Sequence, residues 1–301
     1  MIFAGIDEAG YGPALGPLTV SAAAFEWDED LPAASELYSG LKKTFPRITD
    51  SKQVFTPAKG LRPLEECIYP FVPVWFGKYP STFGTLVESF TGNPLSSVLK
   101  DSPWFNGNDF PLPVSAEWAG PVQKLPDMKS GHAVSSIVNA PLFNSNIRQG
   151  FNKSTLLFSA VCGLIKRLMS RYRNSDLSIT VDRLGGRKFY RRLLAENFIG
   201  SRIEVCSETV QESEYIMHFS TCSVRILFKV KADRDDFCTG LASLISKYLR
   251  ELSMHMFNGY FRERSAGLRA TQGYPQDAKR FLNDIQGLVT ECELSRLVRL
   301  K

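Results

Sequence analysis

Four carboxylates stand at or just after the ends of short apolar segments: Asp7, Glu8, Asp182 and Asp233. Because ligands collect at strand ends in an α/β sheet, these side chains are expected to converge on one edge of a sheet. Converging carboxylates repel one another by several kcal/mol unless divalent cations neutralise them, and Mg²⁺ prefers hard oxygen ligands. Two such ions, about 4 Å apart, activate a water and stabilise the leaving oxygen of a phosphodiester. The pattern therefore favours metal-dependent hydrolysis of nucleic acid.

Each of these carboxylates also fits a structural role. Asp7 and Glu8 could finish a strand and solvate the turn behind it. Asp233 could be the N-cap of a helix, and Asp182 could belong to the turn that follows its strand. Spacing by itself leaves these structural roles open beside the metal-binding one.

Alternating and apolar segments predict the elements that would position the carboxylates. An apolar stretch precedes Asp7, an alternating stretch ends on Asp182, and another delivers the chain to Asp233. The predicted strands are 2–6, 18–25, 177–182, 203–205 and 223–230. The predicted helices are 154–172, 187–197, 233–251 and a segment that begins at Thr56-Pro57 and runs toward Ile68.

The region 73–150 differs in texture from the rest of the chain. Pro, Gly, Asn and Ser accumulate there, and we interpret it as an insertion or an elaborated loop region. Its aromatic and basic residues could stack on bases and meet phosphates, but a small satellite core under a loop is the simpler interpretation. The residues concerned are Trp75, Trp104, Trp118, Lys124 and Lys129.

Composition excludes several classes of protein. The chain has 301 residues, with 44% hydrophobic and 22% charged residues, which is typical of a globular protein and excludes disordered, collagen-like and disulfide-rich classes. No apolar run approaches the roughly 20 residues of a membrane span, and the first residues lack the basic start of a signal peptide, so we expect a cytoplasmic protein without membrane contact. The six cysteines and three histidines are scattered, so any metal would be held by oxygen. A net charge of +5 only permits an anionic partner.

The residues around the carboxylates resemble type 2 ribonuclease H, the ribonuclease HII/HIII family. The resemblance runs in order along the chain and covers most of it outside 73–150. It rests on Gly5-Ile6-Asp7-Glu8-Ala9-Gly10-Tyr11-Gly12-Pro13 with Gly16-Pro17, on Thr49-Asp50-Ser51-Lys52, on Val181-Asp182, on Lys231-Ala232-Asp233 with the segment 242–251, and on Gln272-Gly273-Tyr274-Pro275.

The resemblance implies an α/β, ribonuclease H-like fold. This fold has a mixed five-stranded sheet flanked by helices, a C-terminal helical extension and, in this chain, an internal insertion. Residues 1–260 would form the catalytic domain, interrupted at about 73–150, and residues 261–301 would form an extension that grips the substrate.

The resemblance also implies an activity and the residues that perform it. The chain would be an endonuclease that hydrolyses the RNA strand of RNA–DNA hybrids and leaves a 3′-hydroxyl and a 5′-phosphate. Asp7, Glu8, Asp182 and Asp233 would hold two Mg²⁺ or Mn²⁺ ions. The substrate-binding residues would be Gly10, Tyr11 and Gly12, whose backbone would read the ribose 2′-OH, Ser51, Lys52 and Lys247 at the backbone phosphates, and Tyr274 at the RNA-to-DNA junction. Nucleic acid is the expected partner, and the protein is expected to be a monomer.

The sequence departs from the family at two of these positions. Tyr11 stands between the glycines where the family has arginine, and Gln272 stands where lysine is usual. The loss of the guanidinium favours long RNA–DNA hybrids over single embedded ribonucleotides. Two alternatives stay open: a metal nuclease of the same fold that acts on another structure such as branched DNA, and a non-catalytic nucleic-acid-binding protein.

Overall fold

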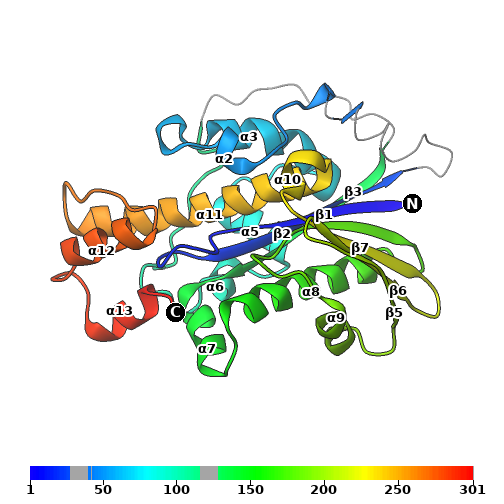
Figure 1. Cartoon of the computed structure of the whole chain (residues 1–301). Helices are drawn as coiled ribbons and strands as arrows, with labels where there is room; N and C mark the ends of the chain where they lie inside the picture. Colours follow the sequence, from blue (N-terminus) through cyan, green and yellow to red (C-terminus); the bar gives the residue numbers. More distant parts are fainter. Residues whose placement is uncertain (28–39, 42, 116–127, 301) are drawn as a thin grey trace.

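In the part of the chain that the structure describes, seven strands form one mixed sheet at the centre of the molecule. The computed structural model describes residues 1–27, 40, 41, 43–115 and 128–300. The strand order is β3-β2-β1-β4-β7-β6-β5, and helices lie on both sides of the sheet (Figure 1). The strands are β1 (Ile2–Ala9), β2 (Leu18–Trp27), β3 (Met128–Val138), β4 (Leu177–Asp182), β5 (Arg202–Glu208), β6 (Glu212–His218) and β7 (Ser223–Lys229).

The three central strands of this sheet run parallel. β1 pairs parallel with β4, and β4 pairs parallel with β7, whereas the remaining pairs are antiparallel. The carboxyl ends of β1, β4 and β7 therefore meet at the same edge of the sheet. This arrangement confirms the predicted α/β fold with a mixed sheet flanked by helices.

The sheet has seven strands rather than the five that we predicted. The two missed strands are β3 and β6, in which polar residues occupy inward positions. In β3, the Ser135 hydroxyl lies 2.8 Å from the Ser21 hydroxyl of β2. In β6, Ser213 is as buried as Tyr215 and Met217. Because the inward residues are not all apolar, hydrophobic alternation is weak and sequence patterns miss these strands.

Helices cover the two faces of the sheet and bury separate cores. The long α11 (Phe237–Arg264) covers one face, and α8 (Lys153–Arg171) covers the other (Figure 1). The other helices are α2 (Ser51–Val54), α3 (Arg62–Ile68), α4 (Val72–Phe76), α5 (Phe83–Thr91), α6 (Leu95–Val98), α7 (Ala140–Arg148), α9 (Arg191–Asn197), α10 (Ala232–Asp235), α12 (Pro275–Asp284) and α13 (Glu291–Leu297), with short 3-10 turns at Pro57–Lys59 and Tyr69–Phe71.

The helix predicted to open at Asp233 begins four residues later. After β7 the chain passes Lys231 in the left-handed region, at φ 56°, and makes the single turn of α10. Asp236 then adopts an extended conformation, and its carboxylate accepts a hydrogen bond from the Thr239 amide at 2.7 Å. Asp236 is therefore the N-cap of α11, and the capping role weighed for Asp233 belongs to another residue.

The region 73–150 contributes to the main sheet and to the main core. Residues 128–138 form β3, so this part of the range is a strand of the sheet rather than a loop elaboration. Trp75 and Trp104 are buried as expected, but in the core of the α11 face rather than in a satellite core. Trp118, Lys124 and the side chain of Lys129 lie outside the described residues. The division of the chain into domains stays a prediction.

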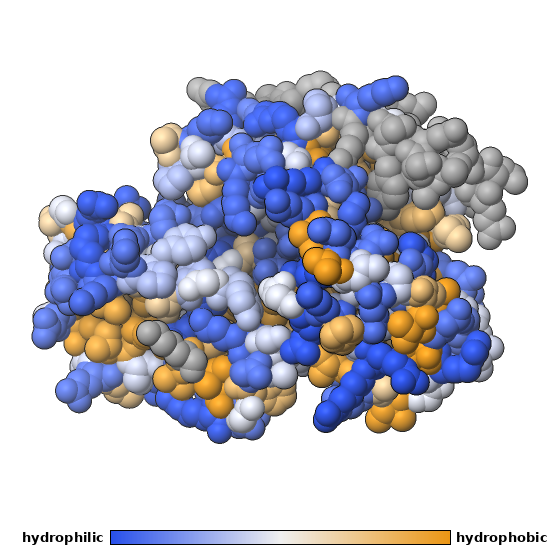
Figure 2. Space-filling model, in the orientation of Figure 1, coloured by the Kyte–Doolittle hydropathy of each residue, from blue (hydrophilic) through white to orange (hydrophobic). Residues whose placement is uncertain are grey.

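The last helices pack beside one end of α11. α12 and α13 form the helical extension, and the segment after α13 pairs with the loop between β1 and β2 through a bridge of Leu15 and Val298. Hydrophilic residues cover most of the face shown in Figure 2, and one of its hydrophobic patches lies over these helices. No helix in the described part of the chain is long and apolar enough to cross a membrane.

Candidate active site

The sheet brings the ends of β1, β4 and β7 together at one edge. Ile6 lies opposite Val181, so Asp7 and Asp182 follow on adjacent strands. Asp233 lies in α10, the short helix that follows β7 in the sequence. The amide of Ala232, the residue before Asp233, donates a 2.8 Å hydrogen bond to the Asp182 carboxylate. Parallel pairing of these strands therefore carries residues more than 220 positions apart to the same place.

Asp7 is the most deeply buried of the four predicted carboxylates, with 5% of its surface exposed. Burial raises its pKa well above the ordinary value of 3.8, and the charges of Glu8, Asp182 and Asp233 raise the pKa further. One Asp7 oxygen accepts a 2.7 Å hydrogen bond from the Glu8 amide. The side chain is thus fixed in place although its negative charge is poorly compensated.

The other three carboxylates respond to the same surroundings. Burial, followed by the charge of Asp182, raises the pKa of Glu8 to about 7. Burial, again followed by Asp182, raises the pKa of Asp233 to about 6, and burial also raises the pKa of Asp182. The Oε2 atom of Glu8 is buried and has no hydrogen-bond partner within the described residues. Uncompensated negative charge and an unpartnered carboxylate oxygen mark the centre of this site.

The types of side chain at this site suit a divalent cation, but the side chains are not arranged as a closed set of metal ligands. Within the residues that the structure describes, no group of three or more carboxyl, imidazole or thiol side chains is arranged so that it could hold a metal ion. The donors are nevertheless hard carboxylate oxygens. Burial raises their pKa values first and neighbouring carboxylates raise them further, and a cation would offset that repulsion.

A fifth carboxylate, Asp50, belongs to the same electrostatic group. It is buried, and its charge raises the pKa of both Asp182 and Asp233. It also accepts a hydrogen bond from the Lys52 amide at 3.0 Å and forms a 3.0 Å ion pair with Arg234. From the sequence, Asp50 is expected only as a member of the motif Thr49-Asp50-Ser51-Lys52. An acidic residue before a short helix is typical of an N-cap. The pattern therefore does not predict that Asp50 also lies near Asp182, Asp233 and Arg234.

The predicted phosphate-contact residues fall into two groups. Lys52 is exposed, and its charge lowers the pKa of Glu8, Asp182 and Asp233, so it lies beside the carboxylates. Its neighbour Ser51 is buried. The structure therefore places the charge of Lys52 beside the carboxylates and exposed to solvent.

Lys247, by contrast, is engaged within the protein. Its side chain is 14% exposed and forms a 2.7 Å ion pair with Glu251. Its ammonium nitrogen also lies 4.4 Å from the ring centre of Phe55. The predicted phosphate contact of Lys247 would require this pair to open.

The loop between β1 and β2, residues 10–17 and called the glycine loop, has a backbone conformation at Gly10 that a residue with a side chain would strain. Gly10 has φ 86°, and a Cβ atom there would lie 2.5 Å from the Pro17 carbonyl oxygen. Tyr11 is partly buried, and its pKa is raised first by burial and then by Glu8, while Arg187 acts in the opposite direction. Arg187 is thus a cation near the loop. Sequence patterns do not mark it as a site residue, because it follows β4, whereas the loop follows β1.

The segment that carries Tyr274 lies beside the same loop. The carbonyl oxygen of Gly273 accepts hydrogen bonds from the amides of Ala14, at 2.7 Å, and Leu15, at 3.1 Å. Tyr274 is 50% exposed, and the guanidinium of Arg250 lies 5.9 Å from its ring centre. The structure therefore brings the two predicted substrate-binding segments into contact with each other.

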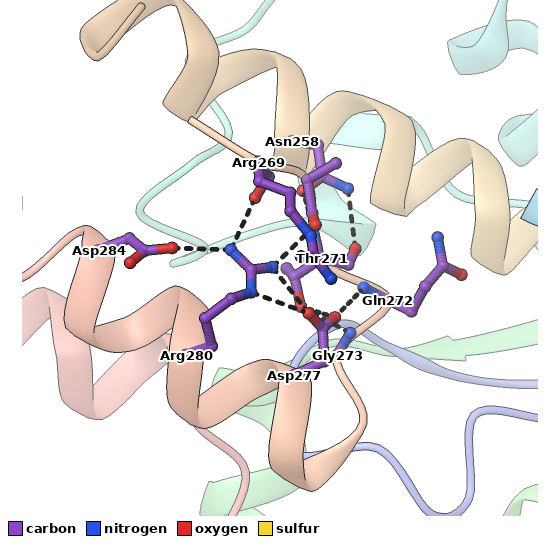
Figure 3. A network of polar contacts seen from close by, with 9 residues as sticks. Asn258, Arg269, Thr271, Gln272, Gly273, Asp277, Arg280 and Asp284 are labelled. Carbon is purple, nitrogen blue, oxygen red and sulfur yellow. Dashed lines mark hydrogen bonds and ion pairs between the residues drawn. The ribbon is translucent and has the colours of Figure 1, made fainter. Parts of the chain in front are cut away.

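Hydrogen bonds from α12 fix this second segment (Figure 3). One Asp277 oxygen accepts hydrogen bonds from the Thr271 hydroxyl and the Gln272 amide, both at 2.7 Å. Arg280 binds Asp277 and donates to the carbonyl oxygens of Arg269 and Ala270. The helical extension thus acts as a frame for residues 269–273.

Comparison with known proteins identifies the class of fold. No family model and no curated protein matches the sequence. Among solved structures, Bst-RNase HIII in complex with Mn²⁺ matches with a TM-score of 0.52 and 13% identity, over 99% of this chain and 66% of that one. A mutant of Bst-RNase HIII matches with a TM-score of 0.52 and 14% identity, over 99% of this chain and 65% of that one. The chain therefore has a type 2 ribonuclease H-like fold.

A further solved structure carries the same family description. It is the RNase HII of the PCNA:RNase HII complex from Archaeoglobus fulgidus, with a TM-score of 0.49 and 15% identity, over 100% of this chain and 95% of that one. The two matches to Bst-RNase HIII confirm the expected fold.

Proposed function

We propose that the chain is an endonuclease that hydrolyses the RNA strand of RNA–DNA hybrids. The observation that carries this proposal is the convergence of Asp7, Glu8, Asp182 and Asp233. Burial and then neighbouring carboxylates raise their pKa values, and one oxygen of Glu8 has no hydrogen-bond partner among the described residues. Such a group is costly in the folded protein, and divalent cations are the ligands that would offset the cost. Two Mg²⁺ or Mn²⁺ ions, held by these carboxylates, would supply an activated water and stabilise the leaving oxygen.

The remaining residues of the site would bind and orient the nucleic acid. Lys52 presents a positive charge beside the carboxylates and would hold a backbone phosphate. The backbone of Gly10 and Gly12 would read the 2′-OH, because only ribose offers this donor and acceptor. Tyr274, half exposed and next to the glycine loop, would pack against the duplex. These residues account for recognition of RNA without contact to particular bases.

The fold is consistent with this proposal. One matching structure, Bst-RNase HIII, is described as a complex with Mn²⁺, the kind of ion proposed here. Tyr11 between Gly10 and Gly12 adds a specificity to the proposal, since a tyrosine cannot pair with a phosphate as a guanidinium does. We therefore expect long hybrids to be cut in preference to single embedded ribonucleotides.

Cleavage of two matched, labelled substrates tests the proposal. A long RNA–DNA hybrid and a duplex with one embedded ribonucleotide would be incubated with the protein in Mg²⁺, Mn²⁺ or EDTA. We expect metal-dependent cutting of the hybrid that leaves 3′-hydroxyl ends, and none by Asp182→Asn. A folded protein that binds the hybrid but cuts neither substrate would contradict the proposal. Cutting of branched DNA alone, in a parallel reaction, would contradict it as well.

A further inference from the structure

The segment after α13 crosses to the glycine loop from a distant part of the sequence. Val298 forms a β-bridge with Leu15, and the Arg299 amide donates a 2.9 Å hydrogen bond to the Ala14 carbonyl oxygen. In Figure 1 this segment lies beside the turn between β1 and β2. The backbone pairing places the side chain of Arg299 directly under the loop.

Arg299 ties the two ends of this loop together. Its side chain is almost fully buried, with the residue 3% exposed. One terminal nitrogen, Nη2, donates to the carbonyl oxygen of Gly10 at 2.7 Å and also to the carbonyl oxygen of Pro13. The guanidinium carbon lies 5.1 Å from the ring centre of Phe143. A single cation thus spans the turn that contains Tyr11 and Gly12.

A buried arginine in this position is unfavourable for stability alone. Burial, followed by the charge of Arg250, lowers its pKa to about 9. Its Nε and Nη1 atoms are buried without a hydrogen-bond partner in the described part of the chain. Buried charges with incomplete hydrogen bonding are often replaced by apolar residues without loss of stability. The two carbonyl groups of the loop are therefore the contacts that give this arginine a specific role.

The segment that carries Arg299 is itself anchored on its other side. Asn144, a buried residue of α7, donates to the carbonyl oxygens of Ser295, at 3.1 Å, and Val298, at 2.8 Å. It also accepts a 2.8 Å hydrogen bond from the Leu300 amide. Because both sides of the segment are bonded, Arg299 is held rigidly rather than carried on a free strand.

A second arginine, Arg250, also confines the loop. A Cβ atom at Gly10 would lie 2.8 Å from atoms of the Arg250 side chain. Arg250 in turn donates a 2.8 Å hydrogen bond to the carbonyl oxygen of Gln272, next to Gly273. The Gly10–Pro13 turn is thus held between the Arg299 segment and the segment that precedes Tyr274.

We propose that Arg299 is a positioning residue that sets the Gly10–Pro13 turn in the conformation that binds substrate. The inference rests on the function proposed above, because it assigns the substrate contact to this turn. Arg299 touches the loop backbone and not the carboxylates, so its loss weakens the grip on the hybrid while the cleavage step is retained.

The test compares Arg299→Gln and Arg299→Lys with a matched control, Arg296→Gln. Arg296 lies three residues before Arg299 and is exposed, and Arg296→Gln removes one positive charge just as Arg299→Gln does. Hydrogen exchange of the full chain reports the loop, and fluorescence anisotropy in EDTA reports the affinity for a labelled hybrid. For Arg299→Gln we expect exchange in residues 10–14 to rise at least about tenfold while the sheet is unchanged. We expect Kd and KM for the hybrid to rise about tenfold, with kcat changed less than about twofold.

The conservative variant separates positioning from stability. Arg299→Lys keeps a charged donor and is expected to lie between wild type and Arg299→Gln, whereas Arg296→Gln is expected to match wild type. Unchanged exchange in the loop, or an equal rise throughout the sheet, would overturn the inference, as would an unchanged Kd. If the wild-type protein binds the hybrid without cutting it, the proposed function fails, and the exchange and anisotropy measurements still decide the role of Arg299.

Discussion

At the scale of single residues, burial and like charge dominate the candidate site. The effect is largest at Asp7, because its carboxylate is buried and three neighbouring carboxylates raise its pKa. A neutral amide of the same shape removes the repulsion and also removes a proposed metal ligand. Stability and activity should therefore respond in opposite directions when one of these carboxylates is replaced.

Asp7→Asn tests this opposition. In EDTA, the variant is expected to be more stable than wild type by on the order of 1 kcal/mol, or a few degrees in Tm, because a buried charge is lost. Cleavage of the hybrid is expected to fall at least about 100-fold, with little change in hybrid binding. Thermal denaturation, cleavage and anisotropy measure the three quantities. Glu196→Gln, at an exposed ion pair, should leave all three unchanged, and near-normal cleavage by Asp7→Asn would remove Asp7 from the metal site.

Tyr11 tests the origin of substrate preference. Tyr11→Arg introduces a guanidinium between Gly10 and Gly12, next to the carboxylate of Glu8. If the residue between the glycines governs recognition of a single ribonucleotide, cutting of that substrate should rise about tenfold relative to the long hybrid. The ratio of the two kcat/KM values is the measurement. An unchanged ratio would place this specificity outside the glycine loop.

The distances between partners along the chain decide which site residues the sequence could predict. Asp7 lies near the end of β1, Asp182 ends β4 and Asp233 follows β7, so local patterns marked them. Asp50 and Arg299 act through contacts that local patterns do not encode. Arg234 binds Asp50 across 184 positions, and Arg299 binds Gly10 across 289.

At the scale of elements, the close approach of α11 to β1 positions the first two carboxylates. A Cβ atom at Gly5 would lie 2.0 Å from the Thr239 amide nitrogen, so only glycine allows this contact. The Ser246 hydroxyl, further along α11, donates a 2.9 Å hydrogen bond to the Asp7 carbonyl oxygen. α11 therefore fixes β1 both by shape and by hydrogen bonding, just where the strand reaches the site.

Gly5→Ala probes this contact. The added methyl group meets backbone atoms, which cannot move aside as a flexible side chain would, so we expect a loss of about 3 kcal/mol or more. The free energy of unfolding in urea measures the effect. Gly163→Ala is the matched control, because Gly163 is an exposed position of α8 with open space around it. That change should stabilise the protein by about 0.5–1 kcal/mol, and equal effects of the two changes would contradict the close approach.

At the scale of the whole molecule, hydrophobic patterning predicted five of the seven described strands and the long helices α8 and α11, whereas the class of fold was predicted from the resemblance to type 2 ribonuclease H. α8 was predicted almost to the residue, because its apolar residues recur at helical spacing and Asn152 caps it. The strand count was wrong because β3 and β6 place polar side chains at buried positions. The helix predicted from residue 187 begins at Arg191, since Gly185 adopts positive φ and Tyr190 is buried before the helix starts.

The stability of the whole protein should depend jointly on pH and metal. Folding raises the pKa of Glu8 from 4.5 to about 7 and that of Asp233 from 3.8 to about 6. A carboxyl with a raised pKa contributes stability that is complete below its ordinary pKa and is lost as pH rises through the folded value. In EDTA, Tm should therefore fall between about pH 4.5 and 7, and Mg²⁺ should restore it most at pH 7 and above.

Calorimetry of wild type and Glu8→Gln, with Mg²⁺ or EDTA, checks this expectation. His132 acts in the other direction: its pKa is lowered to about 4 by burial and two arginines, so its contribution is lost as pH falls from 6.5 through 4. This effect is common to both proteins and cancels in their difference. A pH dependence identical in the two proteins would contradict the role assigned to Glu8.

The pairing of Arg299 with the glycine loop also has a consequence for synthesis. The ribosome makes Gly10 289 residues before it makes Arg299, so the loop remains without this contact during nearly all of translation. A nascent chain that has passed residue 233 already carries all four carboxylates but holds the loop loosely. By the proposal above, the grip on nucleic acid would reach full strength only when residue 299 has joined the fold, and fragments that stop short of it would bind hybrids about tenfold more weakly.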